Sequence, residues 1–159
     1  MKIRRPLFLA VVAATAVSLA SIAVSAVAAE TPFKGTFNGV ETSEVVFPIA
    51  SVTRDGTGTA TYLGKYTSHA SLQVNVMTFL GTGVETFTAA NGDTLSTSVV
   101  GRGTPIGPIP PTMLSIVEVY TITGGTGRFA GATGSFTLDN TLALITHVSS
   151  GTFSGAIDR

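Results

Sequence analysis

The sequence predicts an all-β protein whose strands form an eight-stranded antiparallel up-and-down barrel. The chain beyond residue 30 is rich in Thr, Val, Ile and Phe, which favour strands, and it holds all 18 glycines, which interrupt them. Hydrophobic and polar residues alternate there, as in the segment 72–76, Leu-Gln-Val-Asn-Val. No stretch of a dozen residues in this part has helical spacing free of Gly and Pro. Short strands at hairpin spacing indicate a sandwich or a barrel.

The first 29 residues have the three parts of a secretory signal peptide. A basic start precedes an uncharged apolar run from Pro6 to Ala29, and Ala26-Val27-Ala28 offers the small residues of a cleavage site. The run is also long enough for an uncleaved membrane anchor, but its alanine-rich end favours removal after Ala28 or Ala29. We therefore expect a secreted or periplasmic bacterial protein, with residues 1–29 as signal peptide and residues 30–159 as a single β-barrel domain that has no membrane span.

Charge and composition exclude several classes of function. Residues 30–159 contain six Lys and Arg against nine Asp and Glu, a net charge of −3, so nucleic acid is not a predicted partner. The absence of cysteine excludes a disulfide scaffold. The two histidines, His69 and His147, lack the clustered carboxylates or thiols of a zinc site, and neither a metal nor a cofactor is predicted. His147 shares the phase of Asp139 and Thr141, which we expect to face solvent.

Turn signals divide the domain into strands. Asn91-Gly92 and Asp55-Gly56 each suit a type I′ turn between two antiparallel strands. Gly81-Thr82-Gly83 is expected to end a strand. The segment 104–112, with four prolines, is expected to be a loop or a lid at the barrel rim, outside the ladder. These turns leave eight or nine strands, at 35–39, 45–54, 59–66, 70–80, 84–90, 93–101, 114–122, 135–146 and 151–155.

An internal repeat favours a closed barrel over a sandwich. Residues 35–39 read Gly-Thr-Phe-Asn-Gly and residues 151–155 read Gly-Thr-Phe-Ser-Gly. In a strand each copy presents Gly, Phe and Gly on one face, so that a ring on one strand can cover a glycine on its neighbour. The first and last strands pair only when the sheet closes. A chance match in a chain rich in Gly and Thr is the alternative.

The longest motif, residues 122–134, is rich in glycine. Gly125, Gly127 and Ala130 fit the dinucleotide pattern G-x-G-x-x-A, but a strand follows where that chemistry needs a helix N-terminus. The sequence instead predicts a wide turn, in which Phe129 tucks into the core and Arg128 is solvated or binds an anion. The turn residues are Gly124, Gly125, Gly127, Phe129, Gly131 and Gly134.

This motif resembles two plant families that share an eight-stranded antiparallel barrel. The G-G-T-G-x-F-x-x-A-x-G stretch of dirigent proteins is matched by Gly124, Gly125, Thr126, Gly127, Phe129, Ala132 and Gly134. The I-T-G-G-x-G-x-F-x-G-x-x-G stretch of allene oxide cyclases is matched by Ile122, Thr123, Gly124, Gly125, Gly127, Phe129, Gly131 and Gly134. The run 88–95 is similar to that of secreted bacterial proteins with the same barrel.

The resemblance implies an apolar barrel interior that holds a small hydrophobic molecule. Dirigent proteins steer the coupling of phenol radicals, and allene oxide cyclases steer ring closure of a fatty-acid epoxide. The cyclases' pocket cysteine has no counterpart in this chain, and neither the dirigents' acid and base nor the cyclases' pocket glutamate is located. No catalytic residue is therefore carried over, and enzymatic activity is not predicted. If the protein is an enzyme, we expect an isomerase or cyclase that acts through the shape of its pocket.

Three residues are candidates for ligand binding: Glu118, Tyr120 and Tyr66. Glu118 shares a face with Leu114, Ile116 and Tyr120, the bulkier face of its strand. If that face points inward, desolvation raises the pKa of Glu118; if it points outward, Val117 and Val119 lie inside. Tyr66 could line the same interior or form half-buried wall.

Two functions of different class follow. The first is a secreted soluble barrel that binds a small hydrophobic ligand and directs its cyclisation or coupling. The second is a filled-core structural or interaction module of the cell envelope; oligomerisation is left open. An outer-membrane barrel is disfavoured, because the expected strands are short and the aromatic girdles are missing, with three Tyr and no Trp. No Ser-His-Asp spacing supports a hydrolase.

Overall fold

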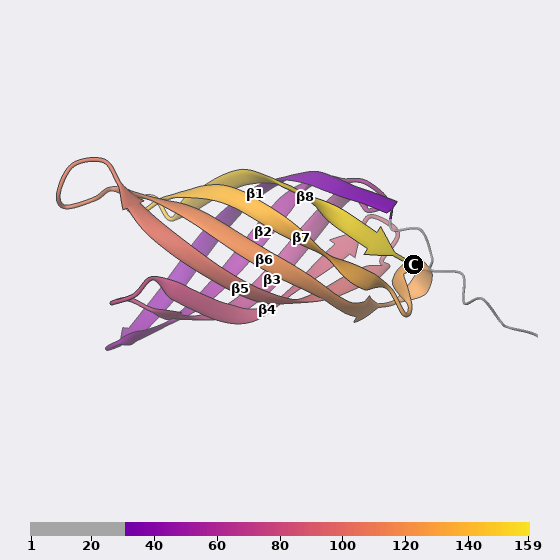
Figure 1. Cartoon of the computed structure of the whole chain (residues 1–159), viewed down its shortest axis with the longest axis horizontal. Coiled ribbons are helices and arrows are strands. Elements are labelled where there is room, and N and C mark those ends of the chain that lie inside the picture. Colours follow the sequence, from indigo (N-terminus) through magenta and orange to yellow (C-terminus); the bar gives the residue numbers. More distant parts are fainter. Residues whose placement is uncertain (1–30) are drawn as a thin grey trace, which may run out of the picture.

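Residues 31–159 form a closed barrel of eight antiparallel strands in the computed structural model (Figure 1). Each strand pairs with the next along the chain, and the last pairs with the first. The strands are β1 (Thr31–Val46), β2 (Ile49–Ala60), β3 (Gly64–Asn75), β4 (Leu80–Ala89), β5 (Thr94–Ile106), β6 (Met113–Gly125), β7 (Thr133–Ala143) and β8 (Val148–Asp158). The predicted eight-stranded antiparallel barrel is confirmed. The predicted signal peptide lies outside the described residues.

Helical structure in residues 31–159 is limited to one 3-10 turn, η1 (Gly127–Phe129). No helix in this range is long and apolar enough to span a membrane.

The barrel closes through the two glycine–phenylalanine repeats, as predicted. Gly35 of β1 lies opposite Phe153 of β8, and Phe37 lies opposite Gly151. The ring of Phe153 lies against Gly35, where any Cβ would overlap it. The missing side chains of the glycines thus make room for the rings that pack between the first and last strands.

The two ends of the barrel differ in what they carry. Four hairpin turns, at 47–48, 76–79, 107–112 and 144–147, lie at one end, which we call the open end (left in Figure 1). The other three turns lie at the opposite end together with Thr31 and the C-terminus, and we call this the closed end.

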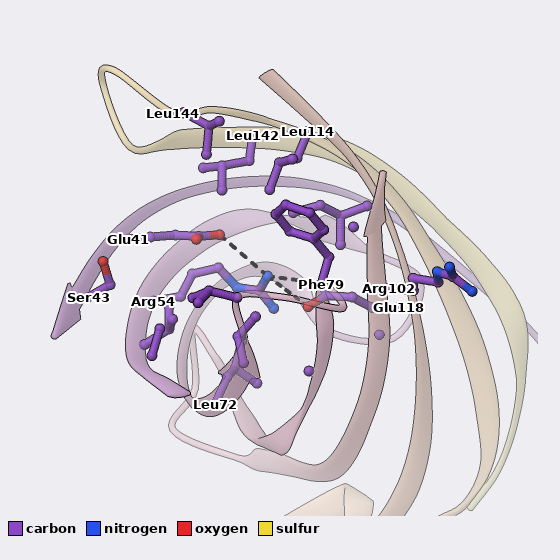
Figure 2. A pocket seen from close by; sticks show the side chains of 18 of the residues that line it. Glu41, Ser43, Arg54, Leu72, Phe79, Arg102, Leu114, Glu118, Leu142 and Leu144 are labelled. Carbon is purple, nitrogen blue, oxygen red and sulfur yellow. Dashed lines mark hydrogen bonds and ion pairs between the residues drawn. The ribbon is translucent and has the colours of Figure 1, made fainter. Parts of the chain in front are cut away.

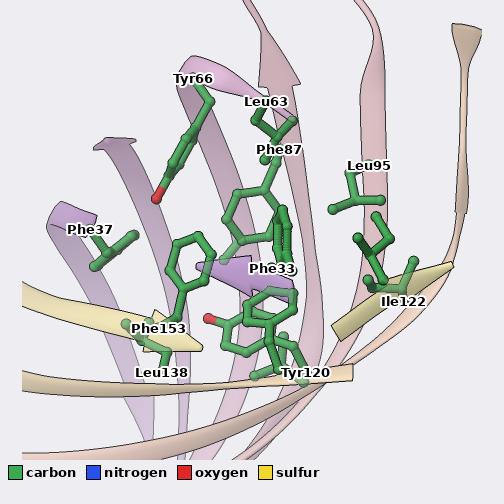
Figure 3. Close-up of a cluster of buried hydrophobic side chains, with 14 of the residues drawn as sticks. Phe33, Phe37, Leu63, Tyr66, Phe87, Leu95, Tyr120, Ile122, Leu138 and Phe153 are labelled. Carbon is green, nitrogen blue, oxygen red and sulfur yellow. The ribbon is translucent and has the colours of Figure 1, made fainter. Parts of the chain in front are cut away.

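The closed half of the barrel is filled by aromatic and aliphatic side chains (Figure 3). The rings of Tyr120 and Phe136 stack with centroids 4.5 Å apart, and Phe33 meets Phe136 edge-on at 5.2 Å. Both arrangements are favoured by the ring quadrupole. The cluster includes Phe33, Phe37, Leu63, Tyr66, Phe87, Leu95, Tyr120, Ile122, Phe129, Phe136, Leu138, Phe153 and Ile157.

The outer face of the barrel is mostly polar. Ser and Thr are the commonest outward residues, as in β2, where Ser51, Thr53, Thr57 and Thr59 are exposed.

Two predicted turns are wrong. Asp55-Gly56 lies within β2, and Gly81-Thr82-Gly83 lies within β4. Gly56 faces inward, where a Cβ would lie 2.5 Å from Cε2 of Phe37, so this glycine makes room for a ring instead of bending the chain. The hairpin turns fall instead at 61–63 and 76–79, where Tyr62 and Phe79 adopt φ of 66° and 55°.

The Asn91-Gly92 turn is confirmed in position but not in type. The amide N–H of Gly92 donates to the carbonyl of Ala89 at 2.9 Å. Gly92 has a φ of +88°, whereas Asn91 is not among the residues with positive φ. A type I′ turn needs positive φ at both positions, so this hairpin uses another turn.

The proline-rich segment 104–112 is only partly a loop, which corrects the prediction. β5 continues to Ile106, and Pro105 lies opposite Leu114 of β6. The pairing of β5 with β4 stops at Arg102. Beyond that point one edge of β5 is free, and a residue without an N–H is tolerated on a free edge.

The glycine-rich turn joins β6 to β7 as predicted. Phe129 is fully buried, and the N–H of Phe129 donates to the carbonyl of Thr126 at 3.0 Å. Arg128 stays at the surface, with Nε 3.6 Å from a carboxylate oxygen of Asp93. Positive φ values occur at Gly124, Gly127, Gly131 and Gly134.

Candidate functional site

A cavity of about 200 Å³ opens at the open end of the barrel (Figure 2). Residues of β1 to β7 and of the hairpin turns line it, with Gly81 as the single contribution of β4 and none from β8. The walls are mostly aliphatic and include Ala50, Val52, Leu72, Val74, Val99, Leu114, Ile116, Leu142 and Leu144. The floor is charged, because Arg54, Glu118 and Glu41 lie where the cavity ends.

The alternation of the strands places these charges inside. Arg54 follows Ala50 and Val52 on the inward face of β2, and its side chain is 1% exposed. Glu118 lies on the inward face of β6 opposite Gly101 of β5, where a Cβ would lie 2.7 Å from Cγ of Glu118. The glycine therefore provides the space that the glutamate side chain occupies.

Arg54 is the centre of a buried hydrogen-bond network. Its Nη1 donates to both carboxylate oxygens of Glu118, at 3.1 and 3.0 Å. Its Nη2 donates to Glu85 at 2.7 Å and to the hydroxyl oxygen of Tyr120 at 2.7 Å. The Tyr120 hydroxyl donates in turn to Glu85 at 2.8 Å, and Nδ2 of Asn140 donates to Glu118 at 3.1 Å. Such charge-assisted bonds offset much of the cost of burying the charges.

Glu41 of β1 belongs to this cluster but makes a longer contact with Arg54 than Glu85 and Glu118 do. Its Oε1 lies 3.7 Å from Nη1 of Arg54, close enough for an ion pair but too far for a hydrogen bond. Glu41 lines the cavity, and Figure 2 shows it on the opposite side of Arg54 from Glu118. One guanidinium thus faces the carboxylates of Glu41, Glu85 and Glu118.

Burial sets the protonation of these groups. Burial raises the pKa of Glu118 and of Glu41, and the positive charge of Arg54 opposes the rise without cancelling it. Burial by itself lowers the pKa of Arg54, but Glu118 and the other partners outweigh it and hold the pKa above the ordinary value. The arginine stays charged, and the two glutamates hold protons at higher pH than ordinary glutamates do.

The structure places the three predicted ligand-binding candidates differently. Glu118 faces inward and lines the cavity, with Val117 and Val119 exposed outside. Tyr120 is buried just beneath the floor, where it bonds to Arg54 and Glu85. Tyr66 lies in the aromatic cluster of the closed half, and its hydroxyl donates to the carbonyl of Thr36 at 2.8 Å. It is not among the residues that line the cavity.

The two histidines also differ. His69 is exposed on the outer face, with Nδ1 2.8 Å from a carboxylate oxygen of Asp55. His147 does not continue the outward phase of β7, because the strand ends at Ala143. It lies in the following turn with a φ of 56° and lines the cavity. His147 is exposed, as expected, and it also borders the cavity at the open end.

The sequence patterns do not identify Arg54, Glu85 or Glu41 as site residues. Asp55-Gly56 has the composition of a turn, which predicts that the strand ends at Arg54. The alternation of β2 contains a signal that could have identified Arg54. Ala50, Val52 and Arg54 share one face of the strand, and Ser51 and Thr53 lie on the other. A charged residue that continues an apolar face is expected to point into the barrel.

Within residues 31–159, no group of three or more His, Cys, Asp or Glu side chains is placed to hold a metal ion. The cavity floor is instead an arginine-centred ion cluster at the base of an apolar cup. No family model, curated protein or solved structure matches the chain.

Proposed function

We propose that the barrel acts outside the cytoplasm, after removal of residues 1–29, as a binding protein for a small, mostly apolar molecule. The observation that carries the proposal is the open cavity of about 200 Å³ with aliphatic walls and a charged floor. Apolar pockets with a few convergent polar groups are typical ligand sites. The resemblance of the glycine-rich turn to dirigent proteins and allene oxide cyclases, which use their barrel interiors, supports the same function.

The floor favours a ligand with one positive or hydrogen-bond-donating group. The Nη1 and Nη2 groups of Arg54 already bond to Glu118, Glu85 and Tyr120, and its Nε, although without a partner, is buried. The carboxylate of Glu41 lines the cavity without a hydrogen bond to the guanidinium. An ammonium or hydroxyl group can donate to it, whereas a ligand carboxylate is repelled by the surrounding glutamates.

The floor also suits the direction of a cyclisation or coupling. Burial raises the pKa of Glu41, and its carboxyl group lines the cavity without a hydrogen bond to Arg54, so its protonated form can donate to an oxygen of a bound molecule. The aliphatic walls restrict the shape that this molecule adopts. The chemical contribution of the protein would then be orientation together with a single proton donor.

Calorimetric titration with three matched probes tests the proposal. The chain 30–159 contains every strand of the barrel and is titrated with 2-phenylethylamine, 2-phenylethanol and phenylacetate, which share one apolar body. We expect the amine to bind most tightly and phenylacetate most weakly. Glu41→Gln is expected to weaken amine binding about tenfold or more, because it removes a charged hydrogen bond, and to change alcohol binding much less.

Glu44→Gln is the matched control, because Glu44 lies on the same strand but is exposed outside the barrel. It is expected to leave all three affinities unchanged. Failure of all three probes to bind at millimolar concentration would reject the binding function. It would favour the filled-core structural module, which the aromatic packing of the closed half already resembles.

A further inference from the structure

The open end of the barrel carries large hydrophobic side chains in all four of its hairpin turns or at their edges. Phe47 is 71% exposed, Met77 67%, Ile109 97% and Ile145 77%, one in each turn. Their exposed neighbours complete what we call the apolar rim: Val46, Phe47, Met77, Leu80, Ile106, Ile109, Met113 and Ile145. No comparably large exposed hydrophobic residue occurs in the closed-end turns of the described chain.

Charges are distributed in the opposite way. The four open-end turns, apart from His147, lie in segments that have no Asp, Glu, Lys or Arg. These segments are 45–53, 70–84, 103–117 and 140–146. Glu44 and Arg102 lie on the adjoining strands. The closed end and its turns, in contrast, carry Lys34, Lys65, Asp93, Arg128, Asp158 and Arg159. The barrel is therefore polarised along its axis, with one uncharged apolar end and one charged end.

The rim surrounds a hollow instead of forming a flat patch. Residues adjoining the rim, including Val45, Val76 and Phe79, line the cavity mouth. The β5–β6 hairpin extends beyond the last pairing of β5 with β4 and projects furthest in Figure 1. A folded protein partner would need a surface that fits four separate tips around an opening. A fluid lipid layer accommodates separate tips, and it accepts only uncharged ones at low cost.

We propose that the apolar rim inserts into a lipid bilayer, so that the barrel docks with its open end on the membrane surface. The cavity mouth then opens into the apolar region of the bilayer. If the proposed ligand binding is also correct, a lipid-soluble ligand enters or leaves the cavity without crossing water. The docking depends only on the rim and can be tested without any ligand.

A tryptophan at the rim reports insertion directly, because the chain has no native Trp. Phe47→Trp is made in the chain 30–159 and mixed with phosphatidylcholine vesicles, with and without brominated acyl chains. We expect a blue shift of the emission and quenching by the brominated lipid. Ala90→Trp, at an exposed closed-end turn, is the matched reporter and is expected to show neither change.

Vesicle co-sedimentation of charged variants measures the contribution of the rim. Phe47→Asp and Ile145→Asp are each expected to lower partitioning about tenfold or more, because a carboxylate resists transfer into the apolar layer. Val119→Asp, an exposed position on the outer face of β6, is expected to leave partitioning unchanged. Adding phosphatidylglycerol or about 0.5 M salt should not strengthen or abolish binding, since the rim has no basic residues. Circular dichroism confirms that each variant is folded.

Any one of three results would overturn the docking. One is a wild-type barrel that does not partition onto vesicles at millimolar lipid, and another is a set of rim variants that bind vesicles as well as wild type does. The third is an equal blue shift of the tryptophan emission at positions 47 and 90. A dimer that Phe47→Asp dissociates, in the absence of lipid binding, would assign the rim to self-association instead. Rim variants that keep their affinity for 2-phenylethylamine but lose vesicle binding separate this inference from the proposed ligand binding.

Discussion

Arg54 shows how a single residue organises the interior of this barrel. A buried guanidinium without partners is far too costly for a domain of this size, and here carboxylates and a tyrosine hydroxyl surround it. The guanidinium carbon also lies 5.0 Å from the centroid of the Phe37 ring. The charge therefore marks the boundary between the filled half of the barrel and the hollow half.

Removal of this charge should destabilise the protein in a pH-dependent way. Arg54→Met leaves the carboxylates buried without a cation, and we expect the free energy of unfolding to fall by about 3–5 kcal/mol at pH 7. The raised pKa values of Glu41 and Glu118 mean that the folded state binds their protons more tightly than the unfolded state. Their contribution to stability is thus full at acid pH and is lost as pH rises through the folded pKa values.

Without Arg54 these pKa values rise further, so the difference from wild type should shrink near pH 4.5, close to the ordinary glutamate pKa. Urea unfolding of wild type and Arg54→Met at about pH 4.5 and about pH 7.5 measures this difference in stability on both sides of the pH range in which the two glutamates titrate. Arg102→Met, at an exposed arginine, should change stability by less than about 0.5 kcal/mol. An equal loss at both pH values would show that repulsion among the glutamates is not the cause.

At the scale of the strands, inward glycines replace side chains that the barrel has no room for. Gly56 of β2 lies under the ring of Phe37, and Gly35 of β1 lies under the ring of Phe153. These glycines do not bend the chain, and neither has a positive φ. Their spacing within the strands reflects the packing of aromatic rings across neighbouring strands.

A pair of alanine substitutions separates the two roles of glycine. Gly56→Ala forces a methyl group to within 2.5 Å of Phe37, and overpacking of this kind costs about 1–3 kcal/mol. Gly103→Ala, also inward and without positive φ, meets its nearest atoms at 3.5 Å and should change stability by less than about 0.5 kcal/mol. Thermal unfolding monitored by circular dichroism compares the two. Equal midpoints would mean that Phe37 moves aside freely.

The whole molecule is a barrel with two unlike halves. The closed half is filled by the aromatic cluster, and the open half contains the cavity. An eight-stranded barrel lies at the size where its side chains either fill the interior or leave room for one small ligand. In this protein the network around Arg54 lies between a filled region and a hollow region of the same barrel.

Two leucines on the same strand test this division. Leu138 and Leu142 both face inward from β7, but Leu138 lies in the filled half and Leu142 on the cavity wall. Leu138→Ala should lower the free energy of unfolding by about 3 kcal/mol or more, because it opens a new cavity. Leu142→Ala should cost only about 1–2 kcal/mol, since a cavity already lies beside it and mainly transfer free energy is lost. Chemical denaturation measures both, and equal costs would contradict the hollow open half.

The sequence by itself determined the all-β class, the closure of the barrel and the glycine-rich turn. Each of these depends on local alternation, on turn chemistry or on a short repeat, which neighbouring residues carry. Only the tertiary structure decided that Arg54, Glu85, Glu118 and Tyr120 meet in one layer, that Asp55-Gly56 is strand, and that one half stays hollow. Alternation shows which residues of a strand share a face, but the register between strands determines which of them lie at the same height in the barrel.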